Sequence, residues 1–201
     1  MQFNKTIYVD VDNTIMASEH RLCELYNREY KTPLEDAMNP DEVTTWDMGI
    51  DSDIVEEIFS RIDFYNSKQV RLYDNVVEVL SKLKRRGYTI IIYSKGSLLN
   101  IASKSMFLDT LLGDIIDGHV FIGSNTVTMG KSMLDMEGSI ILDDHIKNLT
   151  GNNTMYNICA KLTTLEADWN KDFKEDLSKG NFVMHSWSEL PKIIDMIEMI
   201  T

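Results

Sequence analysis

Short apolar strands that alternate with helical segments constrain the fold of this chain more than any other feature. Residues 6–11 and 88–93 are rich in β-branched and aromatic side chains, which is typical of parallel strands covered on both faces. Further strands are expected at residues 118–123, 139–144, 155–162 and 181–185. Helices are expected at residues 74–86, 98–112 and 189–200. Strands separated by helices form right-handed βαβ units, so the pattern predicts an α/β fold with a Rossmann-like parallel sheet.

One interval breaks this alternation. After the first strand the chain shows helical periodicity at about residues 17–30 and 51–61, joined by a polar stretch that contains prolines, and no clear strand. We interpret residues 17–71 as a small inserted helical cap. Residues 1–16 and 72–201 then form one α/β core domain, which suits a chain of 201 residues.

Acidic and hydroxyl side chains follow three of the expected strands. Asp10 and Asp12 follow the first strand, Ser94 follows residues 88–93, and Asp143 and Asp144 follow the apolar run before them. The carboxyl ends of parallel strands meet at one edge of a sheet, so these side chains are expected to converge. A single such aspartate more often caps a helix or faces solvent. Several carboxylates together repel one another unless a cation lies among them, and oxygen ligands favour Mg²⁺.

In this order the residues resemble the four motifs of phosphatases of the haloacid dehalogenase superfamily. The motifs are Asp10-x-Asp12-x-Thr14, Ser94 after an apolar strand, a downstream lysine, and Asp143-Asp144. The position after Asp12 is usually glycine in that family and is Asn13 here. Asparagine is the next best residue for a left-handed backbone, so the departure is compatible with the motif.

The resemblance implies a role for each motif residue. Asp10 would be the nucleophile that forms an aspartyl-phosphate, and Asp12 would protonate the leaving oxygen and then activate water. Mg²⁺ would be held by the carboxylates of Asp10 and Asp143 and by the backbone carbonyl of Asp12. Asp144 would lie next to these ligands without contacting the ion. Ser94 would donate a hydrogen bond to the phosphoryl group.

Two lysines compete for the remaining motif. Lys104 is favoured, because it lies near the start of the helix expected at residues 98–112, and residues 104–113 resemble the lysine-bearing helix of the cytosolic 5′(3′)-deoxyribonucleotidases. Lys131 is retained as a substrate-binding candidate, although a solvated surface charge is the more usual explanation for it. The tripeptide His185-Ser186-Trp187 is also similar to one in that family, where packing and capping rather than catalysis would explain it.

The expected cap adds a third likeness to the deoxyribonucleotidases. Its length is comparable, and Trp46 and the pair Phe64-Tyr65 occupy places where that family puts base-stacking aromatic residues. An aromatic face above a phosphate site suits a nucleotide, since stacking on a base contributes on the order of 1 kcal/mol or more. The alternative is that these rings form the small core of the cap.

The favoured hypothesis is a Mg²⁺-dependent phosphatase of nucleoside monophosphates, a 5′-nucleotidase that prefers deoxyribonucleotides. The alternative is the same chemistry on another small phosphate ester, such as a sugar phosphate. A phospho-accepting module similar to receiver domains is a different class. It is disfavoured because Asp12, two residues from Asp10, would speed hydrolysis of an aspartyl-phosphate.

Charge and composition limit the partners. The formal net charge of −12 disfavours binding to duplex nucleic acid, and it points to a small phosphorylated ligand whose charge a metal ion and lysines offset locally. Cys23 and Cys159 form no metal-ligand pattern and are expected to be free thiols. No apolar run approaches the length of a membrane span, no heptad pattern indicates a coiled coil, and a cytoplasmic location is expected.

Overall fold

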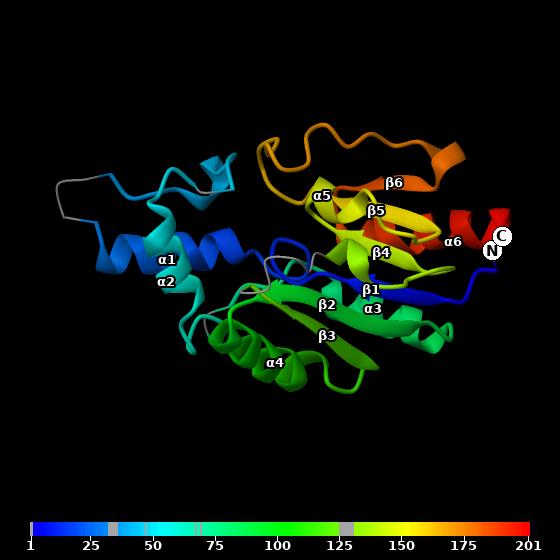
Figure 1. Ribbon diagram of the computed structural model, residues 1–201, viewed down its shortest axis with the longest axis horizontal. Coiled ribbons are helices and arrows are strands. Elements are labelled where there is room, and N and C mark those ends of the chain that lie inside the picture. The colour runs from blue at the N-terminus through cyan, green and yellow to red at the C-terminus, as the bar shows by residue number, and fades with distance from the viewer. Residues whose placement is uncertain (1, 32–35, 47, 67, 69, 125–130) are drawn as a thin grey trace.

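The computed structural model describes residues 2–31, 36–46, 48–66, 68, 70–124 and 131–201, and its centre is a six-stranded sheet (Figure 1). The strands are β1 (Thr6–Val9), β2 (Thr89–Gly96), β3 (Gly118–Gly123), β4 (Ile140–Asp143), β5 (Tyr156–Ala160) and β6 (Asn181–Met184). They lie in the order β3-β2-β1-β4-β5-β6, and every pairing is parallel. The expected Rossmann-like α/β sheet is confirmed.

Strand β1 lies in the middle of the sheet, where the strand order reverses. Val9 is in register with Ile92 of β2 on one side and with Leu142 of β4 on the other. Ile7 and Val9 are fully buried, as the apolar sequence predicts. In open α/β sheets the ligand site lies outside the carboxyl ends of the strands at such a reversal. The fold therefore brings the residues that follow β1, β2 and β4 to one place.

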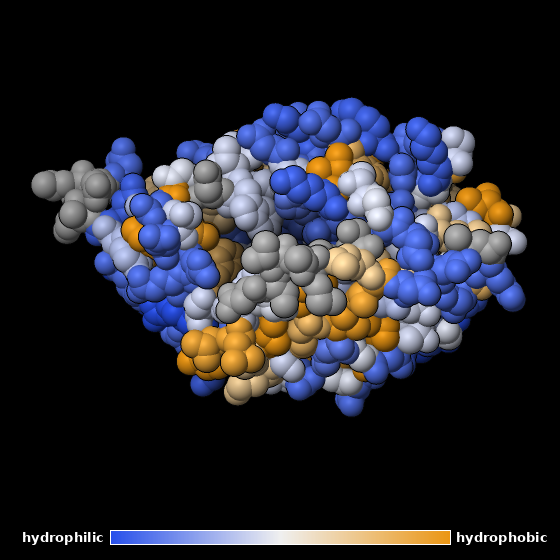
Figure 2. Space-filling view, viewed as in Figure 1, coloured by the Kyte–Doolittle hydropathy of each residue, from blue (hydrophilic) through white to orange (hydrophobic). Residues whose placement is uncertain are grey.

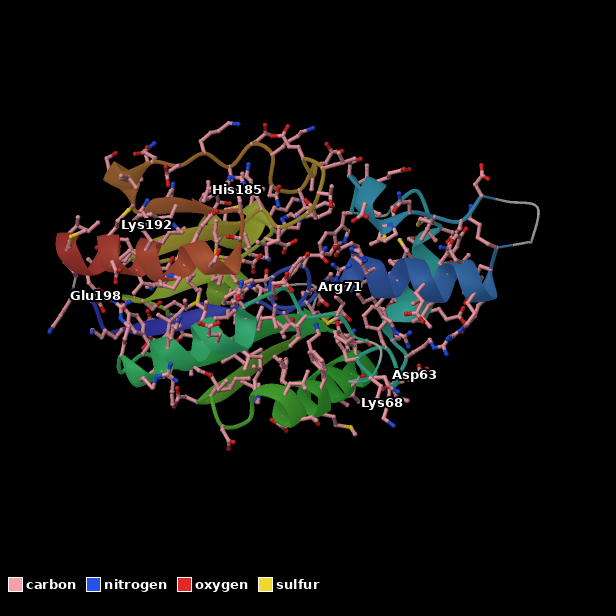
Figure 3. The ribbon with its side chains drawn as sticks, turned by 180° about the vertical axis from the view of Figure 1, so that it is seen from behind. Asp63, Lys68, Arg71, His185, Lys192 and Glu198 are labelled. Atoms are coloured by element: carbon pink, nitrogen blue, oxygen red, sulfur yellow. The ribbon has the colours of Figure 1, made fainter. Side chains whose placement is uncertain are left out.

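Helices cover the two faces of the sheet unequally. α3 (Val76–Arg85) and α6 (Leu190–Ile200) lie across one face (Figure 3), and α4 (Leu98–Leu112) packs against β2 and β3. Together with the sheet they enclose the larger apolar core. The opposite face carries the short α5 (Ile146–Leu149), which the sequence did not predict, and a smaller apolar cluster that includes Tyr93.

Two of the helices between β1 and β2 extend beyond the sheet edge (Figure 1). α1 (Ser18–Glu29) and α2 (Ser52–Phe59) pack against each other. The chain leaves and re-enters the sheet region at one place, where the amide of Ala17 donates to the carbonyl of Arg71 at 3.1 Å. The buried guanidinium of Arg21 donates to two carbonyls of the returning segment. This arrangement places the helical pair over the carboxyl ends of the strands.

Most of the face in view is hydrophilic, and apolar side chains gather along its lower left, over α4 (Figure 2), where Leu98 and Met106 are exposed. Cys23 and Cys159 are buried free thiols. Within the described residues, no helix combines the length and the apolarity that a membrane crossing needs.

Candidate active site

The loop after β1 holds its acids in place through Asn13. This residue adopts a φ of +52°, the left-handed conformation that the sequence predicts for it. Its Oδ1 accepts hydrogen bonds from the amide of Ser18 at 3.1 Å and the hydroxyl of Ser18 at 2.9 Å. The side chain therefore caps the beginning of α1, which has no side-chain cap of its own. Asparagine supplies the backbone conformation of glycine and also this acceptor.

Trp187 supports the same loop from below. Its ring is buried, and its Nε1 donates to the carbonyl of Thr14 at 2.8 Å. His185, two residues earlier, donates its backbone amide to Glu189 at 2.9 Å at the beginning of the last helical region. The tripeptide at residues 185–187 thus packs and caps, as the sequence analysis expected.

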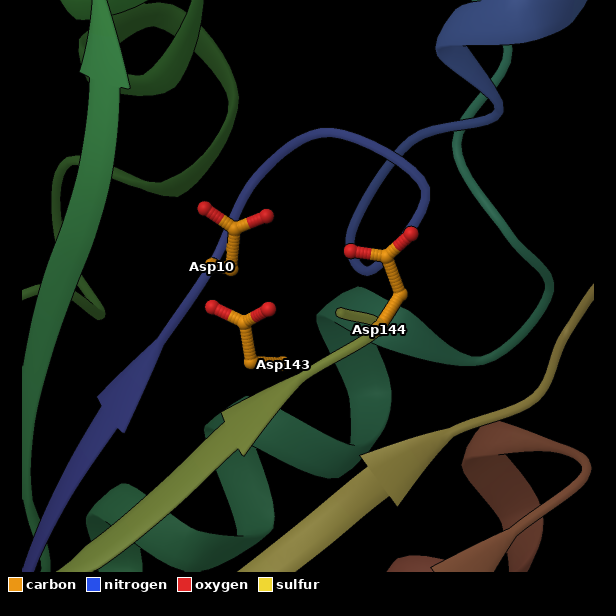
Figure 4. Close-up of side chains that lie close together, drawn as sticks. All are labelled: Asp10, Asp143 and Asp144. Atoms are coloured by element: carbon orange, nitrogen blue, oxygen red, sulfur yellow. The ribbon is translucent and has the colours of Figure 1, made fainter. Parts of the chain in front are cut away.

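Three carboxyl groups form a buried cluster at the ends of β1 and β4 (Figure 4). Ligand oxygens of Asp10, Asp143 and Asp144 all lie within 4.8 Å of one another, and the three residues are at most 6% exposed. Burial raises the pKa of Asp10 to about 6; Lys131 opposes this effect, and Asp143 adds to it. Burial, together with the charge of Asp143, raises the pKa of Asp144 well above its ordinary value. A cation at this position would relieve that repulsion.

Lys131 lies between two of these acids. Its Nζ donates to Asp10 Oδ1 at 2.5 Å and to Asp143 Oδ2 at 2.6 Å, and the residue is 5% exposed. Burial lowers the pKa of Lys131, but the two carboxylates outweigh this effect and raise it overall. The prediction that Lys131 is a solvated surface charge is therefore wrong, because the fold buries its ammonium group in the acid cluster.

Lys104 serves the second acid of the motif. Its fully buried ammonium donates to Asp12 Oδ2 at 2.7 Å, to the hydroxyl of Ser94 at 2.8 Å and to the carbonyl of Lys95 at 3.2 Å. This lysine belongs to helix α4. The structure brings both candidate lysines to the site, each against a different aspartate.

Asp143 and Asp144 differ in how fully they are paired. Asp143 Oδ1 accepts from the amide of His145 at 2.8 Å and from Asn148 Nδ2 at 2.9 Å, while its Oδ2 pairs with Lys131. Asp144 Oδ2 is buried and has no hydrogen-bond partner among the described residues. Three carboxylates against one ammonium leave two negative charges. This donor set fits one hard divalent cation.

The resemblance placed Tyr65, with Phe64, among base-stacking aromatic residues, whereas in the structure the hydroxyl of Tyr65 contacts Asp12, a role that the sequence did not identify. The Tyr65 hydroxyl donates to Asp12 Oδ1 at 2.6 Å, and Asn100 Nδ2 lies 3.3 Å from the same hydroxyl. The two oxygens of Asp12 are thus held from opposite elements, by Tyr65 and by Lys104. The only sequence signal was the aromatic pair at residues 64–65, which gives no hint that a hydroxyl reaches an acid 53 residues away.

A cleft of about 380 Å³ opens beside Asp12. Trp46 and Phe59 line it from the inserted segment, Lys95 lines it from β2, and Trp169 lines it from the loop between β5 and β6. Trp46 is 54% exposed, so a face of its indole is open to a ligand. The sequence pointed to Trp46 but not to the other three.

Phe64 does not line this cleft. It is fully buried, with its ring centroid 4.7 Å from that of Phe59 and 4.8 Å from that of Tyr65. No face of its ring is open for the stacking that the sequence analysis expected. Phe59, which covers it, presents the aromatic surface instead.

The fold recurs in solved structures, whereas no protein-family model and no curated protein matches the chain. A predicted phosphoglycolate phosphatase from Haemophilus somnus 129pt is 16% identical and superimposes over 96% of this chain and 99% of its own, with a TM-score of 0.61. The HAD-hydrolase YfnB from Bacillus subtilis, bound to magnesium, is 16% identical with the same coverages and a TM-score of 0.56. CbbY from Rhodobacter sphaeroides, in complex with xylulose-(1,5)bisphosphate, is 12% identical over 92% and 96%, with a TM-score of 0.54.

At these identities the likeness establishes the architecture. The chain has the fold of the haloacid dehalogenase superfamily of hydrolases. None of the three neighbours is described as a nucleotidase, so the narrower resemblance to the deoxyribonucleotidases gains no support from them.

Proposed function

We propose that this protein is a Mg²⁺-dependent phosphatase that acts on small phosphate monoesters, with Asp10 as the nucleophile. The observation that carries the proposal is the position of the Asp10 carboxylate. It lies at the carboxyl end of the central strand, in contact with Lys131 and beside two further buried carboxylates. Asp12, two residues further on, is held by a second lysine. A nucleophile, a proton carrier and positive charge are the groups that an in-line displacement at phosphorus requires.

The residues can be assigned to two half-reactions. In the first, an oxygen of Asp10 bonds to phosphorus as the ester oxygen leaves, and Asp12 gives that oxygen its proton. In the second, Asp12 takes a proton from water as the water oxygen attacks phosphorus, which releases phosphate and restores Asp10. Ser94 and Lys131 would donate hydrogen bonds to the phosphoryl oxygens.

The donor set for the metal follows from the same geometry. Asp10, Asp143 and Asp144, with the backbone carbonyl of Asp12, would hold Mg²⁺, and the unpaired oxygen of Asp144 favours direct contact. When bound, the ion supplies charge neutralisation and orients the phosphoryl group. The magnesium bound to YfnB supports this choice of ion.

The neighbours favour a small phosphorylated metabolite as the substrate. One is described as a predicted phosphoglycolate phosphatase, and another binds a sugar bisphosphate. The chemistry proposed for this chain needs only the phosphoryl group and a leaving oxygen. The cleft of about 380 Å³ accommodates an organic group of that size.

Nucleoside monophosphates are a second candidate, which the aromatic lining of the cleft favours. Trp46, Phe59 and Trp169 all contribute to its wall. Stacking of a base on an aromatic side chain contributes about 1–3 kcal/mol, so these rings would add affinity for a nucleotide but little for a short acyclic ester.

The test is phosphate release, with Mg²⁺ present, from phosphoglycolate, a panel of sugar phosphates, dUMP and dTMP. The proposal predicts turnover of at least one class, and no turnover of any of them would contradict it. Equal or faster turnover of the sugar phosphates would exclude the nucleotide preference. A stable phosphorylated protein that releases no phosphate would instead support the receiver-like class.

A further inference from the structure

We propose that Trp169, on the core loop between β5 and β6, is a specificity-determining residue that selects ring-bearing phosphate esters over short acyclic ones. This inference rests on the proposed function, because it concerns the substrate of the same site. It differs from the sequence expectation, in which the inserted segment alone supplied aromatic contacts.

The first argument is the position of the ring. Trp169 is 5% exposed, and it lines the same cleft as Asp12 and Trp46. Its carbonyl accepts from the amide of Ile146 at 3.1 Å, which fixes the residue to α5 directly beyond the acids of β4. A rigid aromatic wall next to the reacting groups orders an organic group at small entropic cost.

The second argument is the contact between this loop and the inserted segment. The rings of Trp46 and Trp169 meet edge to face, with centroids 5.8 Å apart and planes at 82°. Beside them, the amide of Asp168 donates to the carbonyl of Thr44 at 2.8 Å. The loop therefore fixes the position of the exposed ring of Trp46, so that both indole rings would contact a ligand in the cleft.

The third argument is the indole N–H. Trp169 Nε1 is buried without an acceptor among the described residues, as Asp144 Oδ2 is buried without a donor. The side chain of Trp169 thus has two features, an aromatic face and an N–H group. Loss of the ring and loss of the N–H are therefore separable changes at one residue.

Charge does not distinguish ring-bearing from acyclic phosphate esters, whereas the aromatic rings of the cleft can. Lys95 is a cation at the cleft and can attract any phosphate ester, whatever its organic group. The three rings, from Trp46, Phe59 and Trp169, offer apolar faces that reward a flat ring and give nothing to a two-carbon acid. Selectivity therefore depends on the rings, and Trp169 is the one held on the core.

The experiment compares kcat/KM for dTMP and for phosphoglycolate in three variants. Trp169→Leu removes the aromatic face, Trp169→Phe keeps a ring but loses the N–H, and Phe173→Leu is the control. Phe173 lies in the same loop as Trp169 and is equally buried, at 5% exposure. It packs in the smaller apolar cluster that includes Tyr93, and it does not line the cleft.

The expected result is a change of ratio. Trp169→Leu should raise KM for dTMP about tenfold and leave KM for phosphoglycolate within about twofold, since one stacking contact is involved. Trp169→Phe should recover most of the loss, and Phe173→Leu should leave the ratio unchanged. Equal losses on both esters, or the same shift in Phe173→Leu, would overturn the inference.

A second variant covers the possibility that Trp169→Leu fails to fold. Trp46 is 54% exposed, so Trp46→Leu changes little of the core, and the same loss of selectivity is expected for it. Unchanged selectivity in Trp46→Leu, with Trp169→Leu unfolded, would count against the aromatic wall.

Binding separates this inference from the proposed function. Two double variants are compared, each carrying Asp10→Asn together with either Trp169→Phe or Trp169→Leu. The binding of dTMP to each is measured by titration with tryptophan fluorescence as the signal. We expect the variant with Trp169→Leu to bind dTMP about tenfold more weakly than the variant with Trp169→Phe. If the protein hydrolyses no phosphate ester but this binding difference persists, the phosphatase proposal fails and the role of Trp169 in selectivity is supported. If turnover occurs and the binding difference is absent, the phosphatase proposal is supported and the role of Trp169 in selectivity fails.

Discussion

Two lysines share the acids of the site. Lys131 contacts Asp10 and Asp143, whereas Lys104 contacts Asp12 and Ser94. This separation gives the nucleophile and the proton carrier different electrostatic surroundings although they are two residues apart. Asp10 is buried among like charges, and Asp12 faces the cleft with both oxygens held by donors.

Tyr65 provides a prediction at the scale of single residues. Tyr65→Phe keeps the ring and removes the hydroxyl that donates to Asp12 Oδ1. We expect kcat on alkyl phosphate esters to fall about tenfold with little change in KM, because a hydrogen bond to a charged group contributes about 1.5–3 kcal/mol. Activity on p-nitrophenyl phosphate, whose leaving group needs little protonation, should fall much less.

The matched control is Tyr26→Phe, which changes a half-buried tyrosine of α1 that stacks on Tyr30 away from the site. Its kinetics on both esters should match those of the unmodified protein. If Tyr65→Phe loses the same factor on both esters, its hydroxyl does not position the proton carrier.

At the scale of elements, the loop after β1 and the beginning of α1 depend on each other through Asn13. Asn13→Gly keeps the left-handed backbone but loses the acceptor for Ser18, and it should lower the free energy of unfolding by about 1 kcal/mol. Asn13→Ala loses the acceptor and also strains the backbone, so about 2 kcal/mol is expected. Urea unfolding measures both, and an alanine variant as stable as the glycine variant would contradict this account.

The sheet could be predicted from the sequence because each strand carries its own local signal. The apolar run before Asp10 and the run before Asp143 both indicate buried parallel strands, and their common edge follows from topology alone. The confirmed convergence of these acids therefore needed no knowledge of side-chain packing.

Residues that reach the site from outside the strand ends could not be predicted in this way. Lys131 meets Asp10 across 121 positions, and Trp169 enters the cleft from a loop without regular structure. Phe64 and Phe59 illustrate the same limit within the inserted segment. Both are aromatic at the sequence level, and only their packing decides that one is buried beneath the other. The division into a cap at residues 17–71 and a core remains our proposal.

At the scale of the whole molecule, negative charge dominates. The chain has 32 acidic and 20 basic residues. Yet three lysines lie at one site: Lys95 lines the cleft, Lys104 contacts Asp12, and Lys131 contacts Asp10. The protein repels extended polyanions, while the site offsets the charge of a single phosphate. A divalent cation would complete that balance.

Metal binding should therefore change the stability of the whole fold. Mg²⁺ at about 100 times its dissociation constant is expected to stabilise the folded protein by about 2.7 kcal/mol, seen as a higher thermal midpoint. Asp144→Asn removes a buried carboxyl group that lies beside Asp10 and Asp143, so without Mg²⁺ it should be at least as stable as the unmodified protein, but its midpoint should respond less to Mg²⁺.

Asp109→Asn is the control for this measurement, because Asp109 is an exposed acid on α4. Its response to Mg²⁺ should equal that of the unmodified protein. A full Mg²⁺ response in Asp144→Asn would show that the ion binds without Asp144.

The central claim is that Asp10 forms a covalent bond to phosphorus. The most direct measurement is mass spectrometry of the Asp12→Asn variant, quenched in acid during turnover with Mg²⁺ and a hydrolysed ester. Loss of Asp12 should slow release of the intermediate, so the account predicts a phosphoryl group on the peptide that contains Asp10, and none when Asp10→Asn is added. A phosphoryl group on another residue, or turnover that survives in Asp10→Asn, would contradict it.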